Sequence, residues 1–373
     1  MKKVLIVHNR EVDDFPPVKS LIEALINNGY KVTIITRDKD NSLRKYGNKI
    51  KLKKLISFSN NKLGNMTSFL KNRRLIRSWT EQEMEENDVI WTTTDATVRE
   101  IGPSLLKYKH IMQLMELVEY VPRFPKIPKQ ELFKFDIQRY ARQAWKVVVP
   151  EENRAYIQKT WWNLKTTPVI LPNKPYNIKI NDSKLSQNII DNIKMLKADS
   201  RIKVLYQGVF YKDRKLDEFA KAIEKKSDKY CLYIMGREND YSRALQKKYP
   251  HVRYLSYVTP PKHLEITKEA DIGLLPYFPT KIGNNSVLNA LYCAPNKLFE
   301  YAAFGKPMLG TDVLGLKLPF KDNFMGYTVF QLDEEEILKK LDDITDNYQT
   351  MSVNAKKFFD SVDWDKKIKE ILN

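Results

Sequence analysis

The stretch KVLIVHNREVDDFPPVKSLIEALINNGYKVTIIT (residues 3–36) contains an apolar run, an amphipathic segment and a second apolar run. The amphipathic segment over 17–28 has apolar residues at helical spacing, which predicts one buried stripe: Val18, Leu21, Ile22 and Leu25. Pro17 suits the first turn of such a helix, and Gly29 suits its end. Strand, helix and strand in this order predict a βαβ unit, the repeating element of parallel sheets.

Short apolar runs alternate with helical patterns along the rest of the chain. Further strands are expected at 88–93, 110–114, 145–149 and 168–171, and then at 202–207, 230–235, 252–255, 271–275, 307–311 and 327–330. Helices are expected at 214–226, 240–248, 260–269, 296–304 and 333–347. This alternation predicts parallel sheets covered on both faces, so the expected fold class is α/β with two doubly wound, Rossmann-like domains. The Pro/Asn-rich stretch LPNKPYN (171–177) suits the linker between them.

Composition excludes several classes of protein. The 373 residues are 42% hydrophobic and 29% charged, which is usual for a globular protein and unlike a disordered or collagen-like chain. Cys231 and Cys293 are too few for a disulfide framework or a cysteine-based zinc site. The first apolar run is too short for a signal peptide, and no run approaches the ~20 residues of a membrane span. We therefore expect a cytoplasmic protein.

The stretch APNKLFEYAAFGKPMLG (294–310) carries the strongest signal for a binding site. Asn296 is expected as the N-cap of a helix of about eight residues, with Gly305 just beyond its end. The free amides of the first turn and the charge of Lys297 suit an anion, and Glu300, one turn on, suits a vicinal diol such as that of ribose. Together they indicate a nucleoside diphosphate. An ordinary surface helix with a Lys–Glu pair fits the same residues equally well.

This stretch resembles the P-N/S-K-x-x-E-Y-x-A-x-G-K-P signature of glycosyltransferase family 4, whose members are retaining enzymes of the GT-B fold. Other stretches resemble family segments in the same order: VVVPEENRAYI (147–157), VILPNKPYN (169–177), YQGVFYKDRKLDEFAKAI (206–223), EADIGLLPY (269–277) and DWDKKIKEIL (363–372). The resemblance implies two Rossmann-like domains facing a central cleft, an acceptor domain (1–173) and a nucleotide-sugar domain (174–355). It also implies a C-terminal helix, about 356–373, that crosses back to the N-terminal domain.

The same resemblance implies residues of the donor site. Arg214 and Lys297 would act in catalysis by holding the donor pyrophosphate and offsetting the charge of the leaving group without proton chemistry. Glu300 would bind the ribose. The other expected donor-site residues are Gly208, Gly236, Arg237, Tyr257, Val258, Tyr277, Asn296 and Leu298. The resemblance implies no cofactor and no metal, since the donor, taken as a UDP-sugar, is itself a substrate.

Three features depart from the family pattern. Tyr292 stands where many members have a second glutamate, and the surrounding stretch 281–293 has the character of a replaced loop. The N-terminal loop HNREVDDFPP (8–17) lacks the glycine pair that approaches the donor in many relatives. Val209 and Phe210 stand where a basic residue is usual.

On the N-terminal side, candidate residues are nominated from their place after strands. His8 ends the first strand, and Asp13 and Asp14 follow in the same loop. Glu116, in QLMELVEY (113–120), follows another strand and resembles a segment of some relatives. Because ligands bind at the carboxyl ends of parallel strands, we nominate His8 and Glu116 for catalysis, and the two aspartates with Glu116 for the acceptor side. A structural or solvated role is the alternative for each.

Motifs of other enzyme classes are absent. The chain has no G-x-G-x-x-G, Walker A, H-E-x-x-H or G-x-S-x-G motif. Two D-x-D pairs occur, Asp38 with Asp40 and Asp363 with Asp365, in a charged turn and at the start of a helix. Solvated acids are usual in both places, so no metal site is predicted.

Much of the net charge of +18 comes from one stretch. Residues 44–77 contain eleven Lys and Arg and no Asp or Glu, interleaved with apolar and aromatic side chains. Such a pattern predicts a segment, 44–79, attracted to an anionic membrane surface at about 1 kcal/mol per basic residue. A solvated basic face is the main alternative. Nucleic acid is disfavoured as a partner because no nucleic-acid-binding fold accompanies the stretch.

These observations predict a glycosyltransferase that moves a sugar from a nucleoside diphosphate sugar to a hydroxyl acceptor, with retention and without metal. The expected acceptor is a glycan or a lipid-linked precursor, as in polysaccharide biosynthesis, and the expected location is the cytoplasm, at the inner face of the membrane. The alternatives are an inverting GT-B transferase, a sugar-nucleotide 2-epimerase and a non-catalytic binding protein on the same fold.

Overall fold

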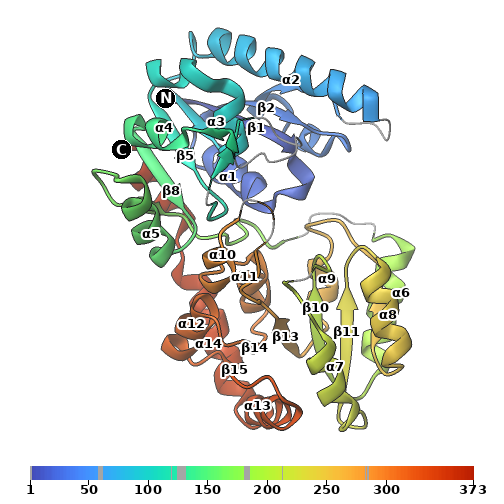
Figure 1. Ribbon diagram of the computed structural model, residues 1–373. Helices are drawn as coiled ribbons and strands as arrows, with labels where there is room; N and C mark the ends of the chain where they lie inside the picture. Colours follow the sequence, from blue (N-terminus) through green and yellow to red (C-terminus); the bar gives the residue numbers. More distant parts are fainter. Residues whose placement is uncertain are drawn as a thin grey trace. The chain divides into compact units, whose positions relative to one another are not determined.

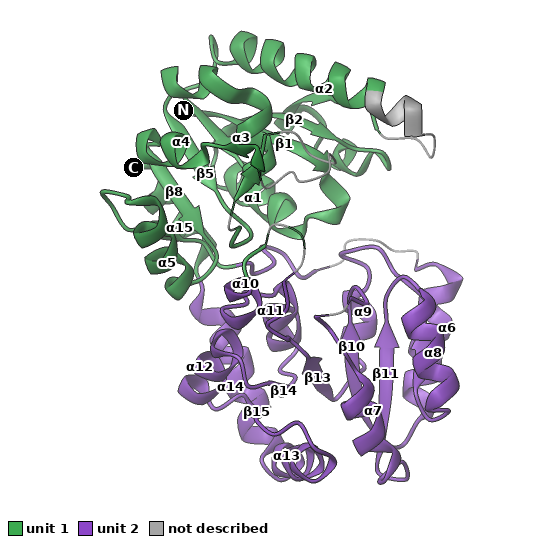
Figure 2. Ribbon diagram, viewed as in Figure 1, with its two compact units in different colours: residues 1–172, 283–286, 363–373 green, residues 173–282, 287–362 purple. Residues whose placement is uncertain are grey.

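The computed structural model describes residues 2–57, 62–118, 120–123, 132–179, 185–211, 213–281, 283 and 285–373. The chain forms two compact α/β units (Figure 2). Unit 1 comprises residues 1–172, 283–286 and 363–373, and unit 2 comprises residues 173–282 and 287–362. In the described part of the chain, no helix combines the length and the apolar character needed to cross a membrane.

Unit 1 is built on a parallel sheet in the order β3-β2-β1-β4-β5-β8-β9. Strands β1, β2, β5 and β8 of this sheet are labelled in Figure 1. The strands are β1 (Lys3–Glu11), β2 (Lys31–Arg37), β3 (Ile50–Lys54), β4 (Val89–Thr92), β5 (His110–Gln113), β8 (Lys146–Val149) and β9 (Val169–Ile170). The helices are α1 (Pro16–Asn27), α2 (Lys62–Glu83), α3 (Asp95–Ile101), α4 (Ile137–Gln143), α5 (Glu152–Trp162) and α15 (Trp364–Leu372). Short 3-10 helices cover Val12–Asp14, Ser42–Lys49 and Gly102–Lys107, and β6 (Val121–Pro122) pairs antiparallel with β7 (Lys134–Phe135).

Strand β1 lies inside the sheet because its apolar run is buried on both faces. Val4, Leu5, Ile6 and Val7 are fully buried, and β1 pairs in parallel with β2 and β4. The predicted strands of the first half are all present. An additional strand, β3, is not among them because its sequence IKLKK is dominated by lysine. Two of these lysines form ion pairs of 2.7 Å with Glu83 at the end of α2, which holds the edge strand to the helix.

Unit 2 repeats this plan with a second parallel sheet, in the order β12-β11-β10-β13-β14-β15. The strands are β10 (Ile202–Gln207), β11 (Tyr230–Met235), β12 (Arg253–Leu255), β13 (Ile272–Leu275), β14 (Met308–Thr311) and β15 (Gly326–Val329). The helices are α6 (Gln187–Ala198), α7 (Asp217–Glu224), α8 (Asp240–Lys248), α9 (Leu264–Thr267), α10 (Leu288–Leu291), α11 (Asn296–Ala303), α12 (Leu314–Asn323), α13 (Glu334–Asp346) and α14 (Tyr348–Ser361). All predicted strands of the second half are present, and both sheets have the doubly wound order.

Two predicted helices of unit 2 are shorter than expected. Helix α7 begins at Asp217 rather than at 214, so Arg214 lies in the preceding loop. Helix α9 covers only Leu264–Thr267 of the predicted 260–269, because the proline pair at 260 and 261 occupies the segment before it. Both differences lengthen the loops that follow the strands.

Helix α11 is fixed against the sheet by one aromatic residue. Tyr301 is fully buried, and its hydroxyl donates a hydrogen bond of 2.8 Å to the carbonyl of Leu205 in β10. At Gly273 of β13 a Cβ atom would lie 2.3 Å from the Tyr301 ring, so only glycine admits the ring there. This packing sets the position of the α11 N-terminus relative to the strand ends.

The C-terminal helix α15 belongs to unit 1, which confirms the predicted return of the chain. Asp363 caps the helix by accepting a hydrogen bond of 3.0 Å from the amide of Lys366. Asn28, after α1, donates one of 2.6 Å to Asp365. The return begins at 363 and not at about 356, because α14 continues in unit 2 as far as Ser361.

Candidate active site at the strand ends of unit 2

Two glycines bring the backbone of neighbouring strand ends close together. Gly208 follows β10, and its amide donates a hydrogen bond of 2.8 Å to Met235 at the end of β11. A Cβ atom on Gly236 would lie 2.1 Å from the Gly208 carbonyl oxygen. Gly208 has a φ of +136°, and a Cβ atom there would lie 2.5 Å from the Cε of Lys297. Gly236 is therefore required for this close approach of the two backbones, and the positive φ of Gly208 favours glycine beside Lys297.

No side chain caps the amides at the N-terminus of α11. The N-cap is Pro295, and Asn296 is the first helical residue, so the predicted capping role of Asn296 is wrong. Proline has no side-chain acceptor, and no cap hydrogen bond is formed, although the amide of Leu298 donates to the Pro295 carbonyl at 3.2 Å. A helix offers no acceptor to the amides of its first turn, here those of Asn296 and Lys297, so this end of α11 suits an anion.

Two cations lie beside this helix end. The guanidinium of Arg214 stacks 3.7 Å from the centroid of the Tyr277 ring, after β13. The ammonium of Lys297 lies 5.9 Å from the same ring and 5.6 Å from that of Tyr206. Arg214 donates to the side chain of Asp213 and, at 2.8 Å, to its carbonyl. Within the described residues, Lys297 makes no hydrogen bond or ion pair, and the Nε of Arg214 has no partner.

Burial and the charge of Arg214 lower the pKa of Lys297 to about 8. At neutral pH the site therefore holds two positive charges with one carboxylate, Asp213, directly paired to them. One positive charge is thus left without a directly paired carboxylate, which suits an anionic ligand.

Glu300 lies one turn further along α11 in a buried network. It is 5% exposed, and its Oε2 accepts a hydrogen bond of 2.6 Å from the amide of Gln207 and lies 3.3 Å from the Nε2 of His263. Gln207 in turn accepts one of 2.7 Å from the Thr267 hydroxyl. Burial acts to raise the pKa of Glu300, but His263, Lys297 and Gln207 together lower it below the usual value. The carboxylate is therefore ionised and available as an acceptor.

Sequence reasoning finds Glu300 but not His263. The two residues are far apart in the sequence, and the segment PPKHLEIT gives no sign of a partner. Only the packing of α9 beside α11 brings them together. A histidine just before a short helix has no distinguishing pattern, so no sequence signal identifies it.

The remaining predicted donor residues form a second group, at the ends of β11 and β12. The guanidinium of Arg237 lies 4.8 Å from the Tyr257 ring centroid, and Val258 is buried next to it in sequence. The hydroxyl of Tyr254 donates a hydrogen bond of 2.7 Å to the Gly236 carbonyl, which joins this group to the glycine pair.

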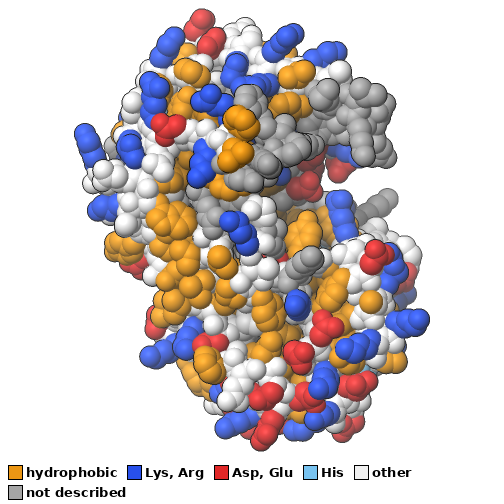
Figure 3. All heavy atoms as spheres, in the orientation of Figure 1, with side chains coloured by type: hydrophobic (Ala, Val, Ile, Leu, Met, Phe, Trp, Pro, Cys, Tyr) orange, Lys and Arg blue, Asp and Glu red, His pale blue; other side chains and the backbone are white. Residues whose placement is uncertain are grey.

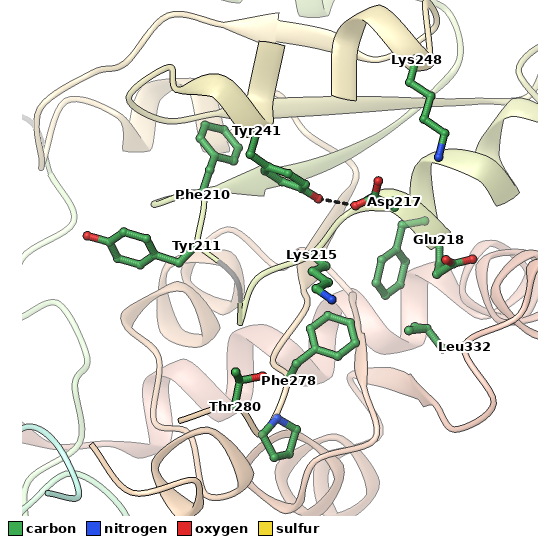
Figure 4. Close-up of a pocket in the computed structure, with 12 residues that line it drawn as sticks. Phe210, Tyr211, Lys215, Asp217, Glu218, Tyr241, Lys248, Phe278, Thr280 and Leu332 are labelled. Atoms are coloured by element: carbon green, nitrogen blue, oxygen red, sulfur yellow. Dashed lines mark hydrogen bonds between the residues drawn. The ribbon is translucent and has the colours of Figure 1, made fainter. Parts of the chain in front are cut away.

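A cavity of about 1000 Å³ lies on unit 2 beside the N-terminus of α7 (Figure 4). Five aromatic residues contribute to its lining: Phe210, Tyr211, Phe219, Tyr241 and Phe278. Tyr241 donates a hydrogen bond of 2.8 Å to Asp217 at its edge. None of the predicted site residues is among the described residues that line it, although Lys215 and Phe278 directly follow Arg214 and Tyr277 in the chain.

The residues predicted for the site in unit 1 differ in their burial and in their partners. His8 is fully buried, its Nδ1 lies 2.8 Å from the Thr93 hydroxyl, and its ring packs edge-on against Phe15. Burial lowers the pKa of His8 to about 3, so it is neutral at neutral pH. Asp13 pairs with Lys19, next to the exposed Asp14. Glu116 is exposed after β5, one strand away from β1 across β4.

The loop that replaces the family's first glutamate contributes to unit 1. The amide of Ser286 donates a hydrogen bond of 2.7 Å to Leu117, and Asn285 forms an isolated bridge with Val118. Tyr292 follows α10 in unit 2. The first acid of each D-x-D pair accepts hydrogen bonds from backbone amides. Asp38 accepts from the amides of Ser42 and Leu43, at 2.7 and 3.2 Å, and Asp363 accepts from that of Lys366.

A family model matches part of unit 2. Residues 201–347 match the sequence model of the family described as Glycosyl transferases group 1. This segment is similar to the group 1 glycosyltransferases. The match confirms the resemblance derived from the 294–310 stretch, and it covers the cation pair and Glu300. Curated proteins gave no match to the chain.

Solved structures share the fold of the whole chain. Anabaena Alr3699/HepE in complex with UDP and glucose is similar with a TM-score of 0.64 at 12% identity, covering 100% of this chain and 99% of that chain. Sucrose-phosphate synthase from Thermosynechococcus elongatus gives 0.61 at 14%, covering 100% and 95%. A putative UDP-N-acetylglucosamine 2-epimerase from Listeria monocytogenes gives 0.59 at 13%, covering 95% and 91%. The fold is therefore GT-B, with two Rossmann-like domains, as predicted.

Proposed function

We propose that the protein transfers a glycosyl group, with retention, from a nucleoside diphosphate sugar bound by unit 2 to a hydroxyl of a glycan or lipid-linked acceptor. The observation that carries the proposal is the unpaired ammonium of Lys297 beside Arg214, at an uncapped helix end with Glu300 one turn away. The family of residues 201–347 supports it, as does the similarity to a structure that holds UDP and glucose.

The site residues act on charge rather than on protons. The bond between the anomeric carbon and the diphosphate oxygen breaks, and the acceptor oxygen bonds to that carbon from the same face. The proton of the acceptor hydroxyl passes to the departing diphosphate. Arg214, Lys297 and the first amides of α11 stabilise the charge that develops on the leaving oxygen. Glu300 accepts hydrogen bonds from the ribose, and no covalent nucleophile is assigned.

The donor site is tested by calorimetric titration with UDP. Arg214→Ala and Glu300→Ala are expected to abolish binding, whereas Arg243→Ala, which removes an exposed arginine of α8 paired with Glu238 and Asp240, should leave it unchanged. Circular dichroism verifies that each variant is folded. Unchanged UDP affinity in both site variants would overturn the assignment.

The stereochemical outcome separates the proposal from its rivals. A retaining transferase keeps the anomeric configuration of the donor, which NMR of the product reveals, and an inverting enzyme reverses it. The similarity to a putative 2-epimerase favours one further candidate, an isomerase. Conversion of a UDP-N-acetylhexosamine to its 2-epimer without acceptor would establish that candidate. A chain that binds UDP but turns over no sugar nucleotide would be a binding protein.

We also propose that the basic stretch 44–79 contacts an anionic membrane that carries the acceptor. Leu70, Lys71 and Arg74 are exposed on one side of α2, and Ile56 before the helix is 40% exposed. The lysines of β3 contribute less, because Glu83 neutralises part of their charge. Over the visible face of unit 2, by contrast, acidic side chains are interspersed among the basic ones (Figure 3).

Sedimentation with vesicles tests the membrane proposal. The wild-type protein should bind vesicles rich in phosphatidylglycerol and not those of phosphatidylcholine. Lys71→Glu with Arg74→Glu should weaken the binding about tenfold or more, because two attractive charges become repulsive. Equal binding by the variant would instead assign the stretch as a solvated basic face.

A further inference from the structure

His263 connects three elements of unit 2 around one carboxylate oxygen. It lies just before α9, is 8% exposed, and its Nε2 is 3.3 Å from the Oε2 of Glu300 on α11. The amide of Gln207, at the end of β10, donates to the same oxygen at 2.6 Å. Glu300 Oε2 is therefore held by α9 and β10 at once.

The Gln207 amide has its orientation fixed from the other side. The Thr267 hydroxyl of α9 donates to Gln207 Oε1 at 2.7 Å, so the nitrogen of the amide must face Glu300. Both groups that hold the carboxylate thus depend on α9, which supplies His263 directly and orients Gln207 through Thr267. Within the described residues, no side chain or backbone group donates to Glu300 Oε1.

Held in this way, the Glu300 carboxylate contacts the protein through Oε2 and can accept a hydrogen bond from a ligand through Oε1. The terminal torsion of glutamate is broad, so an isolated Glu300 would sample many orientations. Two donors on Oε2 restrict that rotation and aim Oε1 in a constant direction. A fixed acceptor discriminates between a ligand with a hydroxyl and one without it, because the missing partner leaves the buried charge unsatisfied.

From this arrangement we infer that His263 is a positioning residue that holds Glu300 for the 2′-hydroxyl of a ribose, and that the site thereby selects ribonucleotides over 2′-deoxyribonucleotides. The inference rests on the proposed function and goes beyond it, because it assigns the sugar selectivity of the nucleotide site to a residue outside the family signature. His263 acts through Glu300 and does not touch the reacting atoms.

The test compares two ligands, UDP and 2′-deoxy-UDP, by calorimetric titration of the full chain. The wild-type protein is expected to bind UDP about tenfold tighter or more, the loss expected when one hydrogen bond to a carboxylate is removed. His263→Phe keeps the ring but removes both nitrogens, so the ratio of the two dissociation constants should fall close to one. His263→Gln keeps a donor within reach of Glu300 and should retain most of the ratio.

A structural role for His263 gives a different result. It would weaken UDP and 2′-deoxy-UDP equally and leave their ratio unchanged, which would overturn the inference. His263→Asn is the second variant if the phenylalanine variant does not fold, because its amide is too short to reach Glu300 and the ratio should again collapse. As a matched control, His251→Phe changes a histidine of the same unit that lies near Glu224, and the ratio should stay at the wild-type value.

Failure of the proposed function and failure of this inference give different results. If the wild-type protein does not bind UDP at all, the proposed function fails and this inference fails with it. If it binds UDP with the same affinity as 2′-deoxy-UDP, the proposed donor site stands, but the selectivity inferred for the Glu300 network is wrong.

Discussion

The end of β1 in unit 1 and the end of β10 in unit 2 occupy equivalent places in two sheets of the same strand order, yet their polar residues are arranged differently. Near the end of β1, Asn9 donates to Glu100 at 2.8 Å and accepts from the hydroxyls of Thr94 and Thr97, at 3.2 and 3.1 Å. These groups satisfy one another. After β10, Lys297 makes no hydrogen bond or ion pair within the described residues and only faces the rings of Tyr206 and Tyr277, and Glu300 keeps one oxygen without a donor.

This difference shows that the end of a parallel strand can hold a binding site, but that its position alone does not make it one. A polar cluster that completes its own hydrogen bonds stabilises the fold and offers nothing to a ligand. A cation buried without an acid costs folding energy, and that cost is offset when an anion binds. Unit 2 carries such a cation, and the Asn9 cluster of unit 1 does not.

Among the tests of this comparison between the two strand ends, the largest expected effect comes from Lys297→Met. UDP affinity should fall about a hundredfold or more, because a charge-assisted contact to the diphosphate is lost at a half-buried position. A Lys297→Arg variant, which keeps the charge, should retain part of the affinity. Calorimetric titration measures both.

The same substitution should stabilise the fold. The pKa of Lys297 is about 8 in the folded state, below its value in the unfolded state. Between these two pH values the folded state binds fewer protons than the unfolded state. Below about pH 8 both states are protonated, and the folded state bears the full free-energy cost of burying the charged lysine. Replacing the lysine should therefore raise the stability by about 1–3 kcal/mol at pH 7. The gain should disappear as the pH approaches the unfolded pKa of the lysine. A variant that melts earlier than wild type at pH 7 would contradict the account of an uncompensated cation.

Asn9→Ala tests the opposite side of the comparison. It leaves Glu100, Thr94 and Thr97 without their buried partner, so the unfolding free energy should fall by about 2–3 kcal/mol. Urea denaturation measures this loss. UDP affinity of the folded variant should match wild type. A loss of UDP binding without a loss of stability would mean that the unit 1 cluster is itself part of the donor site.

The pH dependence of donor use is the smallest of the expected effects. Lys297 carries its charge below about pH 8 in the free protein, so kcat/KM for the donor should be level below that pH. Above it, the value should decline by up to about tenfold per pH unit. The decline should be absent in Lys297→Arg, whose guanidinium stays charged. An unchanged decline in that variant would assign the titration to another group.

The fold is largely predictable from the sequence because each inner strand is a run of buried apolar residues between turn signals. The exception is β3, where Lys51 and Lys53 hide the strand pattern and their partner Glu83 lies 30 or more residues away. Helix α6 falls in a polar stretch for which the sequence gives no clear pattern. Its buried residues, such as Ile189 and Leu196, are too sparse to mark a helix without the sheet beside it.

Only the residues of the candidate site that are close together in the sequence can be predicted from it. Lys297 and Glu300 share one helix, so their spacing alone places them together. His263 and Gln207 join them through the packing of α9 and β10, which no spacing reveals. The wrong prediction of Asn296 as the N-cap has a local cause. The fixed φ of Pro295 lets the helix begin at Asn296, one residue earlier than a side-chain cap at Asn296 would require.

The most direct measurement is a crystal structure of the protein with UDP. The account predicts the diphosphate against the first amides of α11, with Lys297 and Arg214 on its oxygens and Glu300 on the ribose. UDP bound elsewhere on the chain, with the α11 N-terminus free of phosphate, would contradict it.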